Sequence, residues 1–179
     1  ITAQKQKNAD FEGQITAINK SQAVIEFDLE GTIVNANENF LAAMGYSLSE
    51  IKGQHHSMFV DPSYKLSAEY AAFWQSLKAG EHSEGEYKRI AKGGREIWIR
   101  ASYNPIFDST GKPFKVVKFA TDVTQDKLRN AYFEGQINAI GKSQAVIEFD
   151  VDGNIITAND NFLNTMGYRL DEIKGKHHQ

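Results

Sequence analysis

The sequence contains no cysteine. Disulfide frameworks, thiolate nucleophiles and cysteine metal sites are therefore excluded. The absence of cysteine fits a reducing compartment, so we expect this segment to be cytoplasmic, whether or not a longer parent protein is anchored to a membrane elsewhere.

An excess of one charge is also missing. The formal net charge is -3 and no block of Lys or Arg stands out, so neither nucleic acid nor an anionic membrane surface is expected as the main partner. No apolar run approaches the roughly 18 residues that span a bilayer, and the first ten residues contain no apolar signal-peptide core. A composition of 41% apolar and 24% charged residues instead indicates ordinary globular structure.

Catalytic motifs are absent as well. No glycine-rich phosphate loop or nucleophile motif is present. His55 and His56 are adjacent, so they do not share a helix face as paired metal ligands would. Glu84 and Glu86 would share a strand face, but nothing else in the sequence pairs with them. We therefore expect no enzymatic activity.

What the chain does contain is a long internal repeat. Residues 11–56 align without a gap with residues 133–178, and 33 of the 46 positions are identical. The offset of 122 residues suits a whole small domain rather than a solenoid unit. The second copy stops at Gln179, so we expect it to need further strands, or a neighbouring chain, to be stable. The predicted organisation is a linker helix over 1–20, a complete domain over 21–124, a linker helix over 125–142 and the first part of a second domain over 143–179.

The pattern of apolar residues predicts the elements of one unit. Residues 63–79 place Leu66, Tyr70, Phe73, Trp74 and Leu77 on one face of a long helix. Alternating residues and turn signals predict strands, and Asn37 and Ser47 are suited to start short helices. This order predicts an α+β fold in which one five-stranded antiparallel sheet carries short helices on one face. The predicted strands are 22–28, 32–36, 85–91, 96–103 and 114–122, and the predicted short helices are 38–44 and 47–51.

An ordered set of motifs resembles the PAS domain, a bacterial sensory module. The motifs are Asn-Glu-Asn-Phe (37–40), Gly-Tyr (45–46), Glu-Ile-Lys-Gly (50–53), Lys-Gly-Gly-Arg (92–95) and Asp-Val-Thr (122–124). The stretches GQHHSMFVDP and EYAAFWQSLKAGE are similar to PAS domains of methyl-accepting chemotaxis proteins, including tandem-PAS receptors for biofilm dispersal and, more distantly, aerotaxis receptors. The resemblance implies a PAS fold whose signal passes through linker helices to a downstream signalling domain and a histidine kinase complex. The alternative is a ligand-free PAS dimerisation or interaction module.

The resemblance also implies heme or FAD as candidate cofactors. Photosensors of this fold that bond their chromophore to cysteine are excluded, because the chain has none. For heme, His55 and His56 are the candidate axial ligands, with His56 assigned to the iron. A small organic anion held by Arg89 or Arg100 is a further candidate, although charges on strands usually lie on the solvated face. For flavin, the candidate wall and donors are Asn35, Asn37, Trp74, Arg89, Trp98 and Asn104.

The two linker helices carry the same narrow apolar stripe. Phe11, Ile15 and Ile18 recur as Phe133, Ile137 and Ile140. A stripe this narrow suits the seam between two helices, so we expect a homodimer through these helices. The competing interpretation is that each stripe covers the sheet of its own domain.

Overall fold

The computed structural model describes residues 2–179, so Ile1 of the predicted linker helix lies outside the described residues. The chain divides into two compact units, Ile1–Gln125 and Asp126–Gln179, and each is described by itself.

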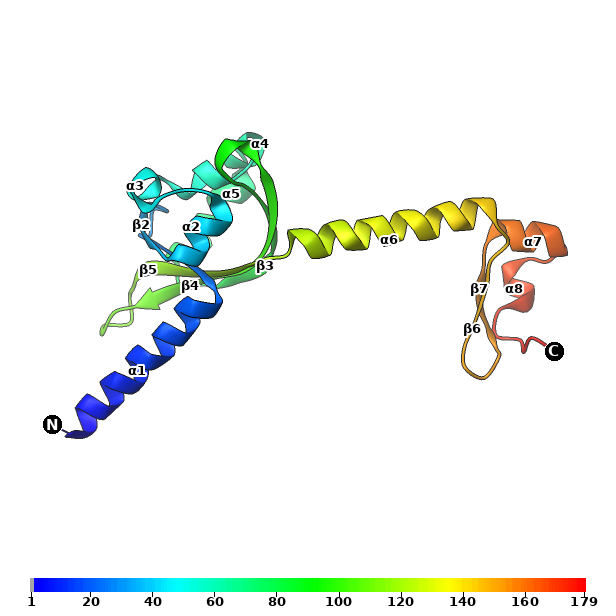
Figure 1. Ribbon diagram of the computed structural model, residues 1–179, viewed down its shortest axis with the longest axis horizontal. Coiled ribbons are helices and arrows are strands. Elements are labelled where there is room, and N and C mark those ends of the chain that lie inside the picture. Colours follow the sequence, from blue (N-terminus) through cyan, green and yellow to red (C-terminus); the bar gives the residue numbers. More distant parts are fainter. Residues whose placement is uncertain (1) are drawn as a thin grey trace. The chain divides into compact units, whose positions relative to one another are not determined.

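The first unit is built on one antiparallel sheet of five strands (Figure 1). The strand order is β2-β1-β5-β4-β3, so the first hairpin joins the last strand in the middle of the sheet. This confirms the predicted α+β fold and its five antiparallel strands. The strands are β1 (Ala23–Phe27), β2 (Ile33–Ala36), β3 (Ser83–Ile90), β4 (Glu96–Phe107) and β5 (Pro113–Asp122).

Short helices connect β2 to β3. The Asn37 side chain accepts a hydrogen bond from the Phe40 amide and starts the first of them, and Gly45, with φ of 75°, ends it. Glu50 accepts a hydrogen bond from the Ser47 amide at 2.8 Å, as the capping box predicts. The elements are α2 (Glu38–Met44), α3 (Leu48–Ile51), η1 (His56–Phe59), α4 (Pro62–Lys65) and α5 (Ala68–Lys78), and a further turn, η2 (Lys92–Gly94), joins β3 to β4.

The prediction of one long helix over 63–79 is wrong. Ser67 interrupts it, because its hydroxyl donates to the Tyr64 carbonyl and accepts from the Tyr70 amide, which caps a new helix. The break turns Leu66 away from the apolar face, leaving its side chain 85% exposed, whereas Leu77 is fully buried.

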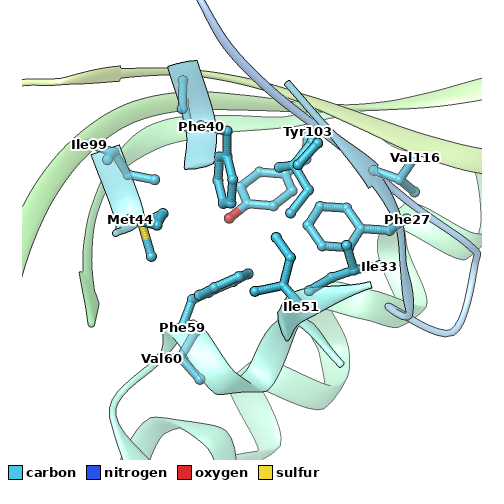
Figure 2. Close-up of a cluster of buried hydrophobic side chains, with 14 of the residues drawn as sticks. Phe27, Ile33, Phe40, Met44, Ile51, Phe59, Val60, Ile99, Tyr103 and Val116 are labelled. Atoms are coloured by element: carbon cyan, nitrogen blue, oxygen red, sulfur yellow. The ribbon is translucent and has the colours of Figure 1, made fainter. Parts of the chain in front are cut away.

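The core lies between the inner face of the sheet and these helices. Inward-facing strand residues such as Ile25, Phe27 and Tyr103 meet Phe40, Met44, Ile51 and Phe59 from the helical side (Figure 2). Phe40 and Phe59 pack edge to face, with ring centroids 5.5 Å apart. Strand alternation therefore decides which side chains belong to the interior.

Helix α1 (Thr2–Ser21) precedes the sheet. Its residues Ile15 and Ile18 line a groove of about 300 Å³ with outer-face residues that include Val24, Val117 and Phe119. Phe11, Ile15 and Ile18 all remain exposed in the chain described here. Part of the stripe thus faces its own sheet and part is uncovered.

The second unit repeats the beginning of the first. Helix α6 (Thr124–Ser143) leads into the antiparallel pair β6 (Ile147–Phe149) and β7 (Ile155–Ala158), followed by α7 (Asp160–Met166) and α8 (Leu170–Ile173). The local structure is copied, down to the Asn159 cap and the isolated bridge between Asn154 and His177. Burial is not copied: Phe149 is 37% exposed, whereas its counterpart Phe27 is fully buried.

Two leucines test the broken helix. We expect Leu77→Ala to lower the free energy of unfolding by about 2–5 kcal/mol, because it leaves a cavity in the core. Leu66→Ala should change it by less than about 0.5 kcal/mol, since that side chain is exposed. Urea unfolding followed by circular dichroism measures both. Equal losses would mean that both leucines face the core, as a continuous helix would require.

Candidate ligand-binding site

His56 lies at the centre of the buried polar groups. Its backbone amide donates to the Gly31 carbonyl at 2.8 Å, which holds η1 against the turn between β1 and β2. The ring is fully buried, with Nδ1 2.8 Å from the hydroxyl of Tyr70 and Nε2 3.0 Å from that of Tyr103. Both ring nitrogens are therefore engaged with tyrosine hydroxyls.

Arg89 enters the same interior from β3. Its Nη2 donates to the Tyr103 hydroxyl at 3.0 Å and its Nη1 to the Lys88 carbonyl at 2.9 Å. The Nε atom is buried without a hydrogen-bond partner. A charged side chain that is only 4% exposed is rare unless it is paired.

Lys118 is the third buried polar residue and comes from β5. It is 1% exposed and stands directly opposite Tyr103 of β4 and Ile25 of β1. Its Nζ lies 4.9 Å from the centre of the Tyr103 ring and 5.8 Å from that of Phe40. Cation–π contacts of this kind compensate in part for the lost hydration of an ammonium group.

The interior is electropositive. Among the described residues the buried polar or charged side chains are His56, Arg89 and Lys118, and none of these is acidic. Burial lowers the pKa of Lys118 well below its ordinary value, and Arg89 lowers it further. Burial, followed by the charges of Lys118 and Arg89, likewise lowers the pKa of His56, so its imidazole is neutral near pH 7.

The tyrosines stay protonated. Burial raises the pKa of Tyr103, and it raises that of Tyr70 to about 12. A neutral imidazole has one donor and one acceptor, so one tyrosine hydroxyl donates to His56 and the other accepts from it. Together these residues connect η1, α5, β3 and β4 through hydrogen bonds.

Three of the predicted site residues come together in this interior: His56, Trp74 and Arg89. Trp74 packs edge to face against Phe27 and His56, at centroid distances of 5.5 Å and 5.4 Å. Charged residues on strands usually face solvent. Arg100 does so and pairs with Glu86 on the outer face, whereas Arg89 points into the interior. The parity of each residue along its strand decides between the two.

The other predicted residues lie elsewhere. Asn35 is exposed on β2, and Trp98 and Asn104 occupy the outer face of β4. Asn37 holds α2 and donates to the Gln22 carbonyl at 2.8 Å. Asn159 makes the equivalent bonds in the second unit, which indicates a structural role for this asparagine.

His55 also has local partners. Its Nδ1 accepts from the Ser57 amide at 3.0 Å, and its Nε2 lies 2.9 Å from the Glu30 carbonyl. The adjacent histidines thus point in different directions, with only His56 reaching the interior.

The predicted cofactors do not fit this arrangement without change. His56 has no free nitrogen for a heme iron, and most of the predicted flavin donors lie outside the interior. Residues 2–179 contain no group of three or more His, Asp or Glu side chains close enough to hold a metal ion. What the interior offers is positive charge beside aromatic surface.

The sequence-based search for site residues missed Lys118 and Tyr103. Their signal is alternation: Lys118 falls between Val116 and Ala120 at the parity that faces inward, and Tyr103 follows Ile99 and Ala101 on β4. A lysine at an apolar parity is the kind of departure that marks a functional site.

Comparison with known proteins assigns the class. The family model described as "PAS fold" matches residues 33–120, and that described as "PAS domain" matches residues 143–179. The PAS domain of a protein from Colwellia psychrerythraea superimposes with a TM-score of 0.56 at 22% identity, over 64% of this chain and 98% of that one. The chain therefore belongs to the PAS family, and two separate stretches of it match.

Among curated relatives the chain is similar to a biofilm dispersion protein and to an aerotaxis receptor. It is 43% identical over 165 residues to the biofilm dispersion protein BdlA of Pseudomonas aeruginosa, covering 92% of this chain and 40% of that protein. It is 34% identical over 101 residues to the aerotaxis receptor of Escherichia coli, covering 56% of this chain and 20% of the receptor. The chain thus spans less than half the length of either relative. The similarity therefore concerns a segment of each of these proteins.

The stability of the fold should depend on pH through His56. Because burial lowers the pKa of His56, its imidazole in the unfolded chain binds a proton below about pH 6.5, whereas in the folded protein it stays neutral to lower pH. The free energy of unfolding should therefore fall as the pH decreases from about 7 to 5. His56→Gln should reduce this decrease, and His82→Gln, in an exposed loop, should leave it unchanged. Urea midpoints across this pH range measure the difference, and identical pH dependence in wild type and His56→Gln would contradict the burial of a neutral imidazole.

Proposed function

We propose that the complete PAS domain is the sensory input module of a bacterial chemoreceptor. It responds to a redox, oxygen or small-molecule cue at the buried polar cluster of His56, Tyr70, Arg89, Tyr103 and Lys118. The response passes through helix α6 to a downstream signalling domain and a histidine kinase complex, with no enzymatic step in this segment and with a cytoplasmic location. The names and similarity of the two relatives support this assignment.

The observation that carries the proposal is the course of strand β5. This strand places Lys118 in the interior and, four residues later, ends at Asp122 beside the first turn of α6. A shift of β5 caused by a change at the cluster would move the start of α6 with it. Sensing and output therefore share one continuous element.

The junction is fastened by hydrogen bonds. Asp122 accepts from the Thr124 amide at 2.9 Å and from its hydroxyl at 2.6 Å. The Thr124 hydroxyl oxygen accepts from the Trp98 amide at 2.9 Å, and the Val123 amide donates to the Trp98 carbonyl at 2.8 Å. Helix α6 is thus tied to two strands, β4 and β5, rather than hanging from a free chain end.

The identity of the cofactor stays a prediction. Heme at His56 would require that His56 give up a tyrosine hydroxyl, and flavin would rely on Trp74 and Arg89 within the interior. An absorption spectrum of the purified protein distinguishes heme, flavin and a domain without a chromophore. Among the described residues, no helix combines the length and apolarity needed to cross a membrane.

The junction supplies the test of function. A chimera in which this chain replaces the matching segment of the Pseudomonas aeruginosa relative should support biofilm dispersion, and Thr124→Val should abolish the response, because it removes the acceptor for the Trp98 amide. Hydrogen exchange at the first turn of α6 should increase while the core stays protected.

The control is Thr121→Val, an exposed residue of strand β5 close to the junction, which should respond as the wild-type chimera does. A Thr124→Val chimera that still disperses biofilm normally would show that the signal does not pass through this junction.

Dimerisation through the linker helices is part of the proposal. The exposed stripe of Phe11, Ile15 and Ile18 on α1 offers an apolar seam to a second copy. We expect wild type to sediment as a dimer and the combined change Phe11→Asp with Ile15→Asp to shift it towards monomer. A wild-type chain that sediments as a monomer at all concentrations would refute pairing along these helices.

A further inference from the structure

The interior of the complete PAS domain contains two cationic side chains and no acid to balance them. Arg89 and Lys118 are 4% and 1% exposed, and no Asp or Glu of the described residues is buried. The neighbouring Glu26 faces outward and pairs with Lys115 at 2.8 Å. A charged group in an apolar interior needs a compensating partner or loses its charge. A bound anion would supply that partner.

Hydrogen-bonding capacity is left over at the same place. The Nε of Arg89 is buried and without a partner, although the two Nη atoms are engaged. The Nζ of Lys118 lies near the rings of Phe40 and Tyr103, and no acceptor of the described residues hydrogen-bonds to it. Tyr103 contacts both side chains, because Arg89 donates to its hydroxyl and the Nζ of Lys118 lies 4.9 Å from the centre of its ring. These donors suit a carboxylate, which accepts several hydrogen bonds from cationic groups.

The side chains around Tyr103 favour a ligand with an apolar body. Phe27, Phe40, Met44, Ile51 and Phe59 lie around the Tyr103 ring (Figure 2). A strongly hydrated inorganic anion would gain little from this apolar and aromatic wall. A compact acid with an apolar body would bury that body against these side chains and present its charge to Lys118 and Arg89.

We propose that the interior of this domain binds a small apolar monocarboxylate, with the carboxylate held by Lys118 and Arg89. This inference rests on the proposed sensory function and names the ligand class of the same site. Because Lys118 belongs to β5 and Arg89 to β3, the ligand would draw together strands on both sides of β4. Binding would thus act on the strand that leads into α6.

The test is calorimetric titration and thermal unfolding of the whole chain with benzoate, phenylacetate and hexanoate. At constant ionic strength at least one of these acids should bind and raise the unfolding temperature, and benzamide, the neutral analogue of benzoate, should not. Lys118→Met and Arg89→Lys should each weaken binding by about tenfold or more, because each removes hydrogen bonds to a charged group.

The matched controls are Lys115→Met, on the outer face of the same strand, and Arg100→Lys, on the outer face of β4; both should bind as wild type does. Without ligand, Lys118→Met should unfold at a temperature no lower than wild type, because it replaces a buried amine that has no hydrogen-bond acceptor with an apolar side chain of similar length. This measurement shows that the variant folds, so lost binding is not lost structure.

Three results would overturn the inference: no binding of any of the three acids to wild type, equal affinity of Lys118→Met and wild type, or equal affinity for benzamide and benzoate. Binding of hemin or FAD instead, seen by absorption, would also overturn it but would leave the sensory function intact. Failure of the proposed sensory function would be seen separately: the chimera that carries the wild-type chain would then not support biofilm dispersion.

Discussion

The buried hydroxyl of Tyr103 is the point on which the rest of this interior depends. The hydroxyl accepts a hydrogen bond from Arg89 and is hydrogen-bonded to the imidazole of His56. The ring of the same tyrosine contacts the Nζ of Lys118. Through these contacts one side chain joins β3, β4, β5 and η1. Each hydrogen bond contributes only about 0.5–1.5 kcal/mol, but an interrupted network would leave buried cations without compensation. The interior is therefore held in one arrangement and is sensitive to anything that changes its charge.

Two of the strands that hold this network, β4 and β5, also hold the start of helix α6. Trp98, on the outer face of β4, receives and supplies backbone hydrogen bonds at the start of α6, while neighbouring residues of β4 face the core. The sheet thus carries the buried polar cluster on its inner face, and its central strand β5 leads directly into α6. In the function proposed above, a shift of β5 would therefore move the start of α6 directly.

The two repeats show how far local sequence reaches. Asn37 and Asn159 make equivalent caps, and both hairpins are followed by the same short helices. His56 is buried among Tyr70 and Tyr103, whereas its counterpart His178 is exposed and contacts Phe149. Local hydrogen bonds need only neighbouring residues, but burial needs residues 57–122, which have no counterpart in the second unit. The chemistry of the histidine comes from its enclosure, not from its motif.

The sequence by itself determined the α+β class, the five strands, the capped short helices and the repeat, because alternation and capping act over a few residues. It also indicated His56, Trp74 and Arg89 as candidates. Only the tertiary structure placed Asn35, Trp98 and Asn104 outside the interior, divided the helix at Ser67 and brought Lys118 to Tyr103. These features depend on contacts between strands far apart in sequence. Such contacts form when the last strand inserts at the centre of the sheet, and no local pattern contains that information.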